Sequence, residues 1–155
     1  MLGTGVVGRK LAGKLRELGH DVLVGSRSAG DDAVPFADAA AHGELVFNCT
    51  NGNASLSALN AAGTDNLAGK VLIDVANVMV DPSALPGKHD IFVCGDDEPA
   101  KAQVAELLQT FGWPADCILD LGDISAARGL EQYLTLWLRL LGPAGGPSFN
   151  IHLVH

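Results

Sequence analysis

The chain has 155 residues, and its 10 Lys and Arg against 18 Asp and Glu give a formal net charge of −8. This acidity argues against nucleic acid as a partner, because binding phosphates requires a basic face. Hydrophobic residues make up 48% of the chain and charged residues 18%, a balance that excludes a disordered protein. No apolar run reaches the roughly 18 residues that cross a bilayer, and no signal peptide opens the chain. We therefore expect a cytoplasmic protein with no membrane partner.

The first half of the chain alternates strand-like runs with Ala- and Leu-rich stretches, which is typical of an α/β protein with a parallel sheet. A glycine-rich loop at 3–8 leads directly into a helix that extends to about Leu18, with apolar residues at helical spacing. The pattern then predicts strands over 21–24, 44–49 and 70–75, and helices over 35–41 and 54–61.

The second half begins with a break in this rhythm, because residues 78–88 contain two prolines and predict a loop. Further strands are expected over 90–94 and 117–120, and helices over 98–111 and 125–141. The last of these helices is apolar on most sides, so we expect it to be buried in a core or against another subunit. An apolar stretch at 148–154 follows it.

The glycine-rich loop has the spacing G-x-G-x-x-G, in which each glycine has its own role. Gly3 permits a tight turn, Gly5 allows the backbone to approach a pyrophosphate, and Gly8 allows close packing of the helix on the sheet. The N–H groups of Val6 and Val7 open the helix, where free donors and the helix dipole favour an anion. The following helix and strand favour a dinucleotide site over a purely structural turn.

The end of the second strand distinguishes NADP from NAD. A site for NAD places Asp or Glu there, about 20 residues beyond the glycines, to hold the ribose hydroxyls. This chain has Ser26 and Arg27, a hydroxyl and a guanidinium that suit a 2′-phosphate. The sequence therefore predicts NADP, against the alternative that Arg27 is a solvated surface residue.

Together with later segments, these residues resemble the family of coenzyme F420-dependent NADP oxidoreductases, also called NADPH-dependent deazaflavin reductases. The resemblance runs through 2–8, 19–27, 93–97 and 119–128 and continues into the final helix. GTGVVG and GSR also occur in other NADP enzymes, whereas CGDD and DLGDISAAR are specific to this family. The resemblance predicts a Rossmann-type, doubly wound, mostly parallel sheet with the C-terminal helix packed on it, in a single NADP-binding domain over residues 1–155.

The resemblance also implies an activity, namely reversible hydride transfer between NADPH and an 8-hydroxy-5-deazaflavin, coenzyme F420, as the small-molecule hydride acceptor. The final helix would support a homodimer. The pyrophosphate would be lined by Thr4, Gly5, Val6 and Val7, and the 2′-phosphate would be held by Ser26 and Arg27. The nicotinamide half would lie along Thr50 and Asn51. Ser125 would line a deazaflavin cleft between the carboxyl edge of the sheet and the C-terminal portion.

The chain departs from the family pattern at two places. Only Met1 and Leu2 precede the glycine loop, where a full first strand is expected. Asn77 runs directly into Val78, where the family has a further strand and loops. We hypothesise that the sequence holds only part of a longer chain, and an intact mass close to 16.0 kDa would refute this.

Two other functions remain open at this point: an NADPH-dependent reductase of a flavin or ferric complex, and a non-catalytic NADPH-binding sensor. No catalytic acid–base pair is evident, and hydride transfer needs positioning rather than a proton relay. The histidines show no ligand spacing, so we expect no metal site. The acidic cluster Asp96-Asp97-Glu98 lies directly before a helix, so capping is favoured over a functional carboxylate cluster. Asp123 is likewise expected to cap the final helix, while Cys49 is expected to be a buried, unreactive thiol.

Overall fold

The computed structural model describes residues 1–28, 30, 32–75 and 82–154. By its internal contacts the chain divides into two compact units, Met1–Val80 and Asp81–His155, and each is described by itself. Whether both belong to one domain stays a prediction. The junction of residues 77 and 78, at which we hypothesise an absent segment, lies outside the described residues.

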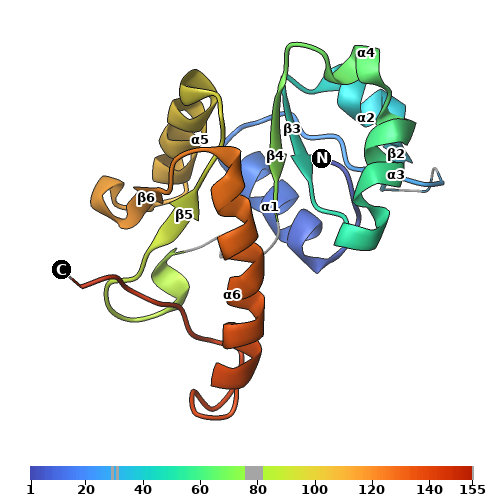
Figure 1. Cartoon of the computed structure of the whole chain (residues 1–155). Helices are drawn as coiled ribbons and strands as arrows, with labels where there is room; N and C mark the ends of the chain where they lie inside the picture. The colour runs from blue at the N-terminus through green and yellow to red at the C-terminus, as the bar shows by residue number, and fades with distance from the viewer. Residues whose placement is uncertain (29, 31, 76–81, 155) are drawn as a thin grey trace. The chain divides into compact units, whose positions relative to one another are not determined.

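Unit 1, Met1–Val80, contains two parallel strand pairs and the helices that connect them (Figure 1). Its elements in chain order are α1 (Val6–Glu17), β1 (Gly25–Ser26), β2 (Val34–Pro35), α2 (Phe36–His42), β3 (Leu45–Asn48), α3 (Gly52–Ala62), α4 (Thr64–Leu67) and β4 (Val71–Asp74). Strand β1 pairs with β2, and β3 pairs with β4. The predicted helices and the strands at β3 and β4 are thereby confirmed.

Leu2 joins the two strand pairs of unit 1. It forms parallel bridges to Gly25 on one side and to Asn48 on the other. Its N–H donates to the carbonyl of Phe47 at 2.7 Å, and its own carbonyl accepts from the N–H of Cys49 at 2.8 Å. Leu2 is fully buried. The strands of unit 1 therefore follow the order β2, β1, Leu2, β3, β4.

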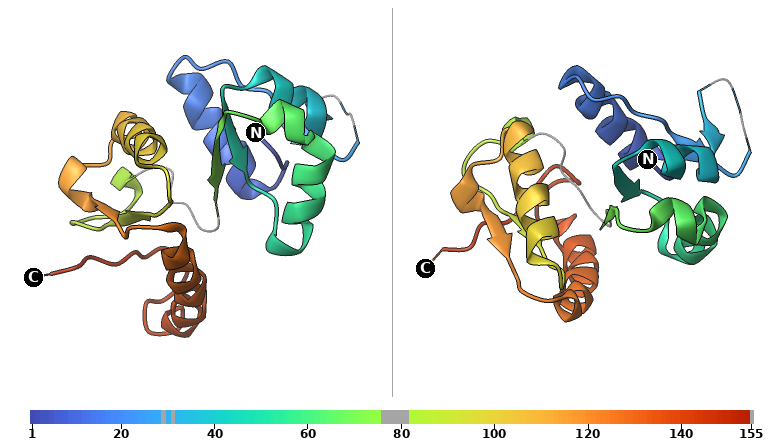
Figure 2. Two further views of the ribbon diagram at one scale, coloured as in Figure 1. Left: turned by 45° about the horizontal axis from the view of Figure 1, so that its top comes forward. Right: turned by 90° about the horizontal axis from the view of Figure 1, so that it is seen from above.

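The direction of the chain reverses at Leu2. The chain moves from Leu2 through α1 to β1 on one side, and it returns from β2 through α2 to β3 on the other side. Figures 1 and 2 show α1 on one face of the β3–β4 pair and α2 and α3 on the other. This confirms the doubly wound arrangement and makes Leu2 its topological switch point. Open α/β sheets bind ligands outside the carboxyl ends of the strands at such a point.

The core of unit 1 forms where α2 and α3 pack on the strands, and small side chains in both helices permit a close approach. Its buried members are Leu2, Phe36, Ala39, Ala40, Val46, Ala58 and Ala62. Helix α1 buries a second stripe formed by Gly8, Leu11, Ala12 and Leu15.

Some elements differ from the sequence-based expectation. The strand expected over 21–24 is wrong in its bounds, because the strand β1 comprises Gly25–Ser26, although the Val24 carbonyl accepts from the N–H of Val34 at 2.9 Å. Strand β2 and helix α4 are not predicted, because a strand of two residues and a helix of four carry no periodic pattern.

Unit 2, Asp81–His155, has one parallel strand pair with a helix between the strands in the chain. Its elements are η1 (Pro82–Ala84), β5 (Ile91–Val93), α5 (Glu98–Thr110), η2 (Ala115–Cys117), β6 (Ile118–Asp120), η3 (Ile124–Ala126) and α6 (Ala127–Leu140), where η marks a 3₁₀ turn. No residue of α6 is buried in this single chain, and Leu136 and Leu138 are 54% and 53% exposed. Burial of this helix against another subunit, one of the two expectations for it, stays a prediction.

The last residues of unit 2 are bound to the segment that precedes β5. The Asp90 N–H donates to the carbonyl of Ile151 at 2.9 Å, and the buried Asp90 carboxylate accepts from the N–H of Leu153 at 2.6 Å. His152 Nδ1 lies 3.0 Å from the same carboxylate. Burial alone would raise the pKa of Asp90, but the hydrogen bonds from Leu153 and His152 bring it below its ordinary value. The carboxylate therefore stabilises the folded unit in its charged form.

Candidate functional site

The glycine loop lies at the switch point of unit 1, and two of its glycines are required by the backbone around them. Gly3 has φ +113°, and a Cβ there would lie 2.9 Å from the carbonyl oxygen of Cys49. A Cβ on Gly8 would lie 2.5 Å from the carbonyl oxygen of Gly3. Around Gly5, in contrast, no described atom lies within 4 Å of an added Cβ. The loop is thus tight toward the protein at Gly3 and Gly8 and open at Gly5.

The start of helix α1 offers free donors to an anion. Gly5 is its N-cap and supplies no side-chain hydrogen bond, and the first turn contains no acidic residue. The first intrahelical bond runs from the Arg9 N–H to the Gly5 carbonyl at 3.0 Å, so the N–H groups of Val6 and Val7 precede the hydrogen-bonded turns. This arrangement, in which the helix dipole adds partial positive charge, fits a pyrophosphate.

The end of the β1 strand carries the residues predicted for the 2′-phosphate. Arg27 is exposed, and its guanidinium makes no hydrogen bond or ion pair with any residue that the structure describes. The Ser26 hydroxyl, in contrast, donates to the Ser28 carbonyl and accepts from the Ser28 N–H at 3.3 Å. Arg27 is therefore available to a phosphate as it stands, whereas Ser26 would have to exchange its partners.

The loop after β3 lies directly beside the glycine loop, as the short Gly3–Cys49 approach requires. Asn48 is fully buried, and its amide donates to the Ser55 hydroxyl at 2.5 Å while its Oδ1 accepts from the Thr50 hydroxyl at 2.7 Å. Asn51 is the N-cap of α3, and its Oδ1 accepts from the Asn53 N–H at 2.9 Å. Thr50 and Asn51 are thus held in place at the predicted edge, and their contact with a nicotinamide stays a prediction.

Cys49 lies between the glycine loop and β3 and is not a reactive thiol. Burial raises its pKa to about 11, so the thiolate is scarce at neutral pH. Its Sγ lies 3.2 Å from the sulfur of Met1. Cys49 is partly buried rather than buried, and its raised pKa agrees with the expected lack of reactivity.

Ser125 belongs to unit 2, so the structure does not place it relative to the glycine loop. It lies in the η3 turn, and its N–H donates to Asp123 Oδ1 at 2.8 Å. Asp97 caps α5 in the same way through the Ala100 N–H at 2.9 Å. The predicted cap of α5 is confirmed at Asp97. Asp123 caps the η3 turn instead of the final helix, because α6 begins only at Ala127 and its N-cap, Ala126, makes no side-chain hydrogen bond. The role of Ser125 at a deazaflavin stays a prediction.

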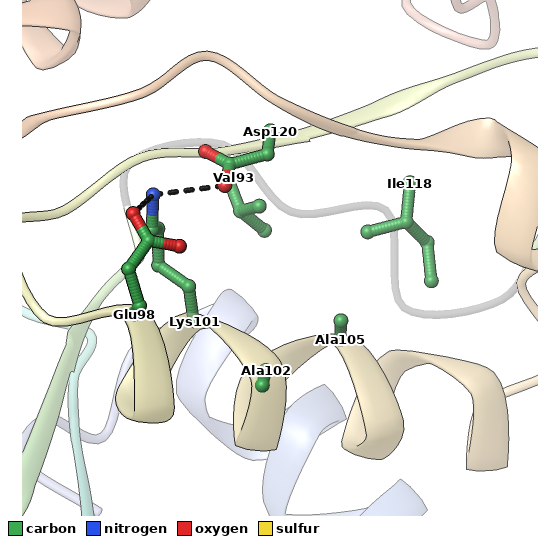
Figure 3. A pocket seen from close by; sticks show the side chains of 7 residues that line it. All are labelled: Val93, Glu98, Lys101, Ala102, Ala105, Ile118 and Asp120. Atoms are coloured by element: carbon green, nitrogen blue, oxygen red, sulfur yellow. Dashed lines mark ion pairs between the residues drawn. The ribbon is translucent and has the colours of Figure 1, made fainter.

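A hollow of about 210 Å³ lies in unit 2 between α5 and β6 (Figure 3). Lys101 reaches into it from α5, and its Nζ lies 2.8 Å from both a Glu98 and an Asp120 oxygen. The hydrogen bonds with Asp120 and Glu98 raise the pKa of Lys101 above its usual value. Because this ammonium is paired with two carboxylates of the protein, it is not free to bind an anionic ligand.

Two residues of the unit 1 site lie outside the sequence motifs and were not expected there. Arg9 donates from Nε to the Thr4 carbonyl at 2.8 Å, and Asn48 anchors the loop after β3. A polar residue at the last position of a buried strand is a signal that could have identified Asn48. For Arg9 the only signal is a basic residue directly after the third glycine.

Comparison with known proteins gives consistent results. The family model described as NADP oxidoreductase coenzyme F420-dependent matches residues 1–78. A crystal structure from Arthrobacter sp. FB24, of a protein whose proposed activity is that of an F420-dependent NADP reductase, is 35% identical with a TM-score of 0.92. That match covers 99% of this chain and 97% of the other.

A more distant relative is the metalloreductase STEAP3 of Rattus norvegicus, which is 27% identical over 195 residues. The match covers 97% of this chain but only 37% of STEAP3, so the chain spans little more than a third of that protein. Within the described ranges, no helix is long and apolar enough to cross a membrane.

The half-chain match to the family model and the close structural neighbour agree with the glycine loop at the switch point of unit 1 and with Arg27, which follows β1 and has no partner among the described residues. The chain belongs to the family of coenzyme F420-dependent NADP oxidoreductases.

Proposed function

We propose that this protein transfers a hydride between NADPH and an 8-hydroxy-5-deazaflavin, coenzyme F420. The observation that carries the dinucleotide half of this proposal comes from unit 1, where the start of α1 has no side-chain cap and Arg27 has no partner among the described residues. The deazaflavin half is supported by membership of the family and by the proposed activity of the Arthrobacter neighbour.

In this proposal the residues of unit 1 bind and orient the dinucleotide. When bound, NADPH supplies a hydride, which the deazaflavin takes up together with a proton from water. The N–H groups of Val6 and Val7 bind the pyrophosphate, and Arg27 binds the 2′-phosphate through charge-assisted hydrogen bonds. Thr50, oriented by the buried Asn48, lies along the nicotinamide half.

The activity is tested by mixing the full chain with NADPH and oxidised coenzyme F420 and following the absorbance of the oxidised deazaflavin. Bleaching that depends on the protein supports the proposal. NADPH oxidation with a flavin or ferric complex, but no bleaching of the deazaflavin, would instead support the second candidate, which the similarity to STEAP3 favours. NADPH binding without turnover of any acceptor would indicate a sensor.

Arg27 is tested by comparing the two dinucleotides. Removing one charge-assisted phosphate contact costs about 1.5–3 kcal/mol, so Arg27→Ala is expected to weaken NADPH binding by roughly 10- to 100-fold. NADH lacks the 2′-phosphate, and its dissociation constant is expected to stay the same. Fluorescence titration of each dinucleotide measures both values, and an unchanged NADPH dissociation constant would refute the assignment of NADP to Arg27.

The homodimer expected from the sequence is also part of the proposal. Its support is the exposed apolar surface of α6, where Leu134, Leu136 and Leu138 are 37%, 54% and 53% exposed. The molar mass in solution, measured by light scattering, tests it, and a monomer at micromolar concentration contradicts it.

A further inference from the structure

Arg9 is the first residue after the glycine motif, and it makes two contacts with the loop. Its backbone N–H donates to the Gly5 carbonyl at 3.0 Å, and its side-chain Nε donates to the Thr4 carbonyl at 2.8 Å. One residue thus holds two successive carbonyl groups of the turn that precedes α1.

We propose that Arg9 is a positioning residue of the dinucleotide site, which fixes the Thr4–Gly5 peptide and directs its remaining guanidinium N–H groups toward the pyrophosphate. Arg9 would then support NADPH and NADH equally, in contrast to Arg27. The inference rests on the proposed NADP site of unit 1 and adds a residue that the motif does not include.

Arg9 fixes the orientation of one peptide group, the one between Thr4 and Gly5. Thr4 lies between Gly3 and Gly5, and glycine restricts the backbone less than any other residue, so this peptide has little intrinsic reason to keep one orientation. A trans peptide is planar, and its N–H points opposite to its C=O. By holding the Thr4 carbonyl, Arg9 therefore also fixes the direction of the Gly5 N–H at the start of α1. A site arranged before binding loses less entropy when the ligand arrives.

Arg9 also brings a positive charge to the start of α1. The Arg9 side chain is exposed, and Nε provides its single side-chain hydrogen bond to the described residues. The other N–H donors of the guanidinium remain for a ligand. The first turn of α1 contains no acidic residue that could neutralise them. A cation held at this helix start adds to the field of the helix dipole, which favours an anion.

Lys10 provides a matched control for this charge. It is the next residue on α1, it is exposed, and it makes no hydrogen bond or ion pair within the described ranges. Replacing Lys10 or Arg9 by Ala changes the net charge of α1 by the same amount, but only the Arg9 change releases the Thr4 carbonyl.

The test is a fluorescence titration of NADPH and of NADH with the full chain and its Arg9→Ala, Arg9→Lys, Lys10→Ala and Arg27→Ala variants. We expect Arg9→Ala to weaken the binding of both dinucleotides by roughly tenfold and to leave the ratio of the two dissociation constants unchanged. Lys10→Ala is expected to change either constant by less than about twofold, because exposed charges contribute little on their own. The dissociation constants of Arg9→Lys are expected to lie between those of the wild type and those of Arg9→Ala, because a lysine keeps the charge without the guanidinium geometry.

Several results would overturn the inference. One is an Arg9→Ala variant that binds both dinucleotides as Lys10→Ala does, and another is a loss confined to NADPH, as expected for Arg27→Ala. A wild-type chain that binds neither dinucleotide would instead reject the proposed function itself. If Arg9→Ala lowers the melting temperature, its weaker binding could come from general destabilisation or from loss of the contact with the loop. Addition of millimolar guanidinium separates these two explanations. Restored dinucleotide affinity supports a role at the loop, and no restoration in a folded variant counts against it.

Discussion

Arg27 in unit 1 and Lys101 in unit 2 both lie near the carboxyl ends of parallel strands, but their surroundings are opposite. Arg27 makes no hydrogen bond or ion pair with a described residue, whereas Lys101 is paired with both Glu98 and Asp120. The sequence shows a cation at each place and does not distinguish them. What distinguishes them is the number of carboxylates that the fold brings within hydrogen-bond distance.

The helices that start at these two edges differ in the same way. Helix α1 has no side-chain cap and no acid in its first turn, while α5 is capped by Asp97 and has Glu98 in its first turn. The start of α5 is therefore satisfied by carboxylates of unit 2, whereas the start of α1 has no side-chain partner and suits an anion. A glycine near a helix start is common to both units, so the absence of acid at α1 is the more informative feature.

The largest effect is expected at Gly8, where the loop of unit 1 is tightest. The Cβ of Gly8→Ala would lie 2.5 Å from a backbone oxygen, so the loop must move, and we expect a loss of about 3 kcal/mol in the free energy of unfolding. Gly5→Ala is the matched control, because no described atom lies within 4 Å of its added Cβ.

Gly5→Ala is expected to change the free energy of unfolding by no more than about 0.5 kcal/mol while it weakens NADPH binding. Urea unfolding and NADPH titration on both variants measure the two effects separately. If Gly5→Ala binds NADPH as the wild type does, the prediction that a pyrophosphate approaches Gly5 is wrong.

A smaller effect is expected at Asp90, where unit 2 depends on a charge for its stability. Asp90→Asn removes the carboxylate that accepts from the Leu153 N–H and pairs with His152. We expect the free energy of unfolding to fall by about 2 kcal/mol. NADPH binding by unit 1 should not change. Asp116→Asn, which affects an exposed pair with Lys88, should have a much smaller effect on stability.

The sign of the pH dependence follows from the lowered pKa of Asp90 in the folded state. The unfolded chain has the ordinary carboxyl pKa, so the stabilisation is fully present above that pKa and is lost as the pH falls through the lower pKa of the folded state. Between pH 7 and pH 3, the free energy of unfolding of the wild type should therefore fall more steeply than that of Asp90→Asn. Parallel curves would contradict the role of this carboxylate.

The smallest effect is expected from making α1 resemble α5. Val6 is 74% exposed in the first turn of α1, so Val6→Glu places an acid there without disturbing the core. We expect NADPH binding to weaken by roughly tenfold through repulsion of the phosphates, and stability to rise by about 0.3–1 kcal/mol through the helix dipole. Val6→Gln is the neutral control, and equal NADPH binding by the Glu and Gln variants would contradict an anion site at α1.

Much of the fold and part of the candidate site could be predicted from the sequence. Gly3 and Gly8 are predictable because a motif spacing encodes a local turn, and Asp97 because capping depends on neighbouring residues. The bond from Arg9 to the Thr4 carbonyl could not be predicted, since a rotamer choice decides it.

The sequence could not predict that Arg27 has no partner within the described part of the chain, nor that Lys101 is paired. Both states depend on residues that the fold brings together, such as Asp120 beside Lys101. The partners of Ser26 are local, but they result from a turn conformation that the GSR sequence does not specify.

The central position of Leu2 has a consequence for the order in which unit 1 folds. Leu2 is separated from its partners, Gly25 and Phe47, by long stretches of sequence. It therefore cannot take its place until β1 and β3 exist, and closing such long loops is slow. We expect the glycine loop, which directly follows Leu2, to become ordered only in this late step. The capacity to bind a dinucleotide would then be among the last properties that unit 1 acquires during folding.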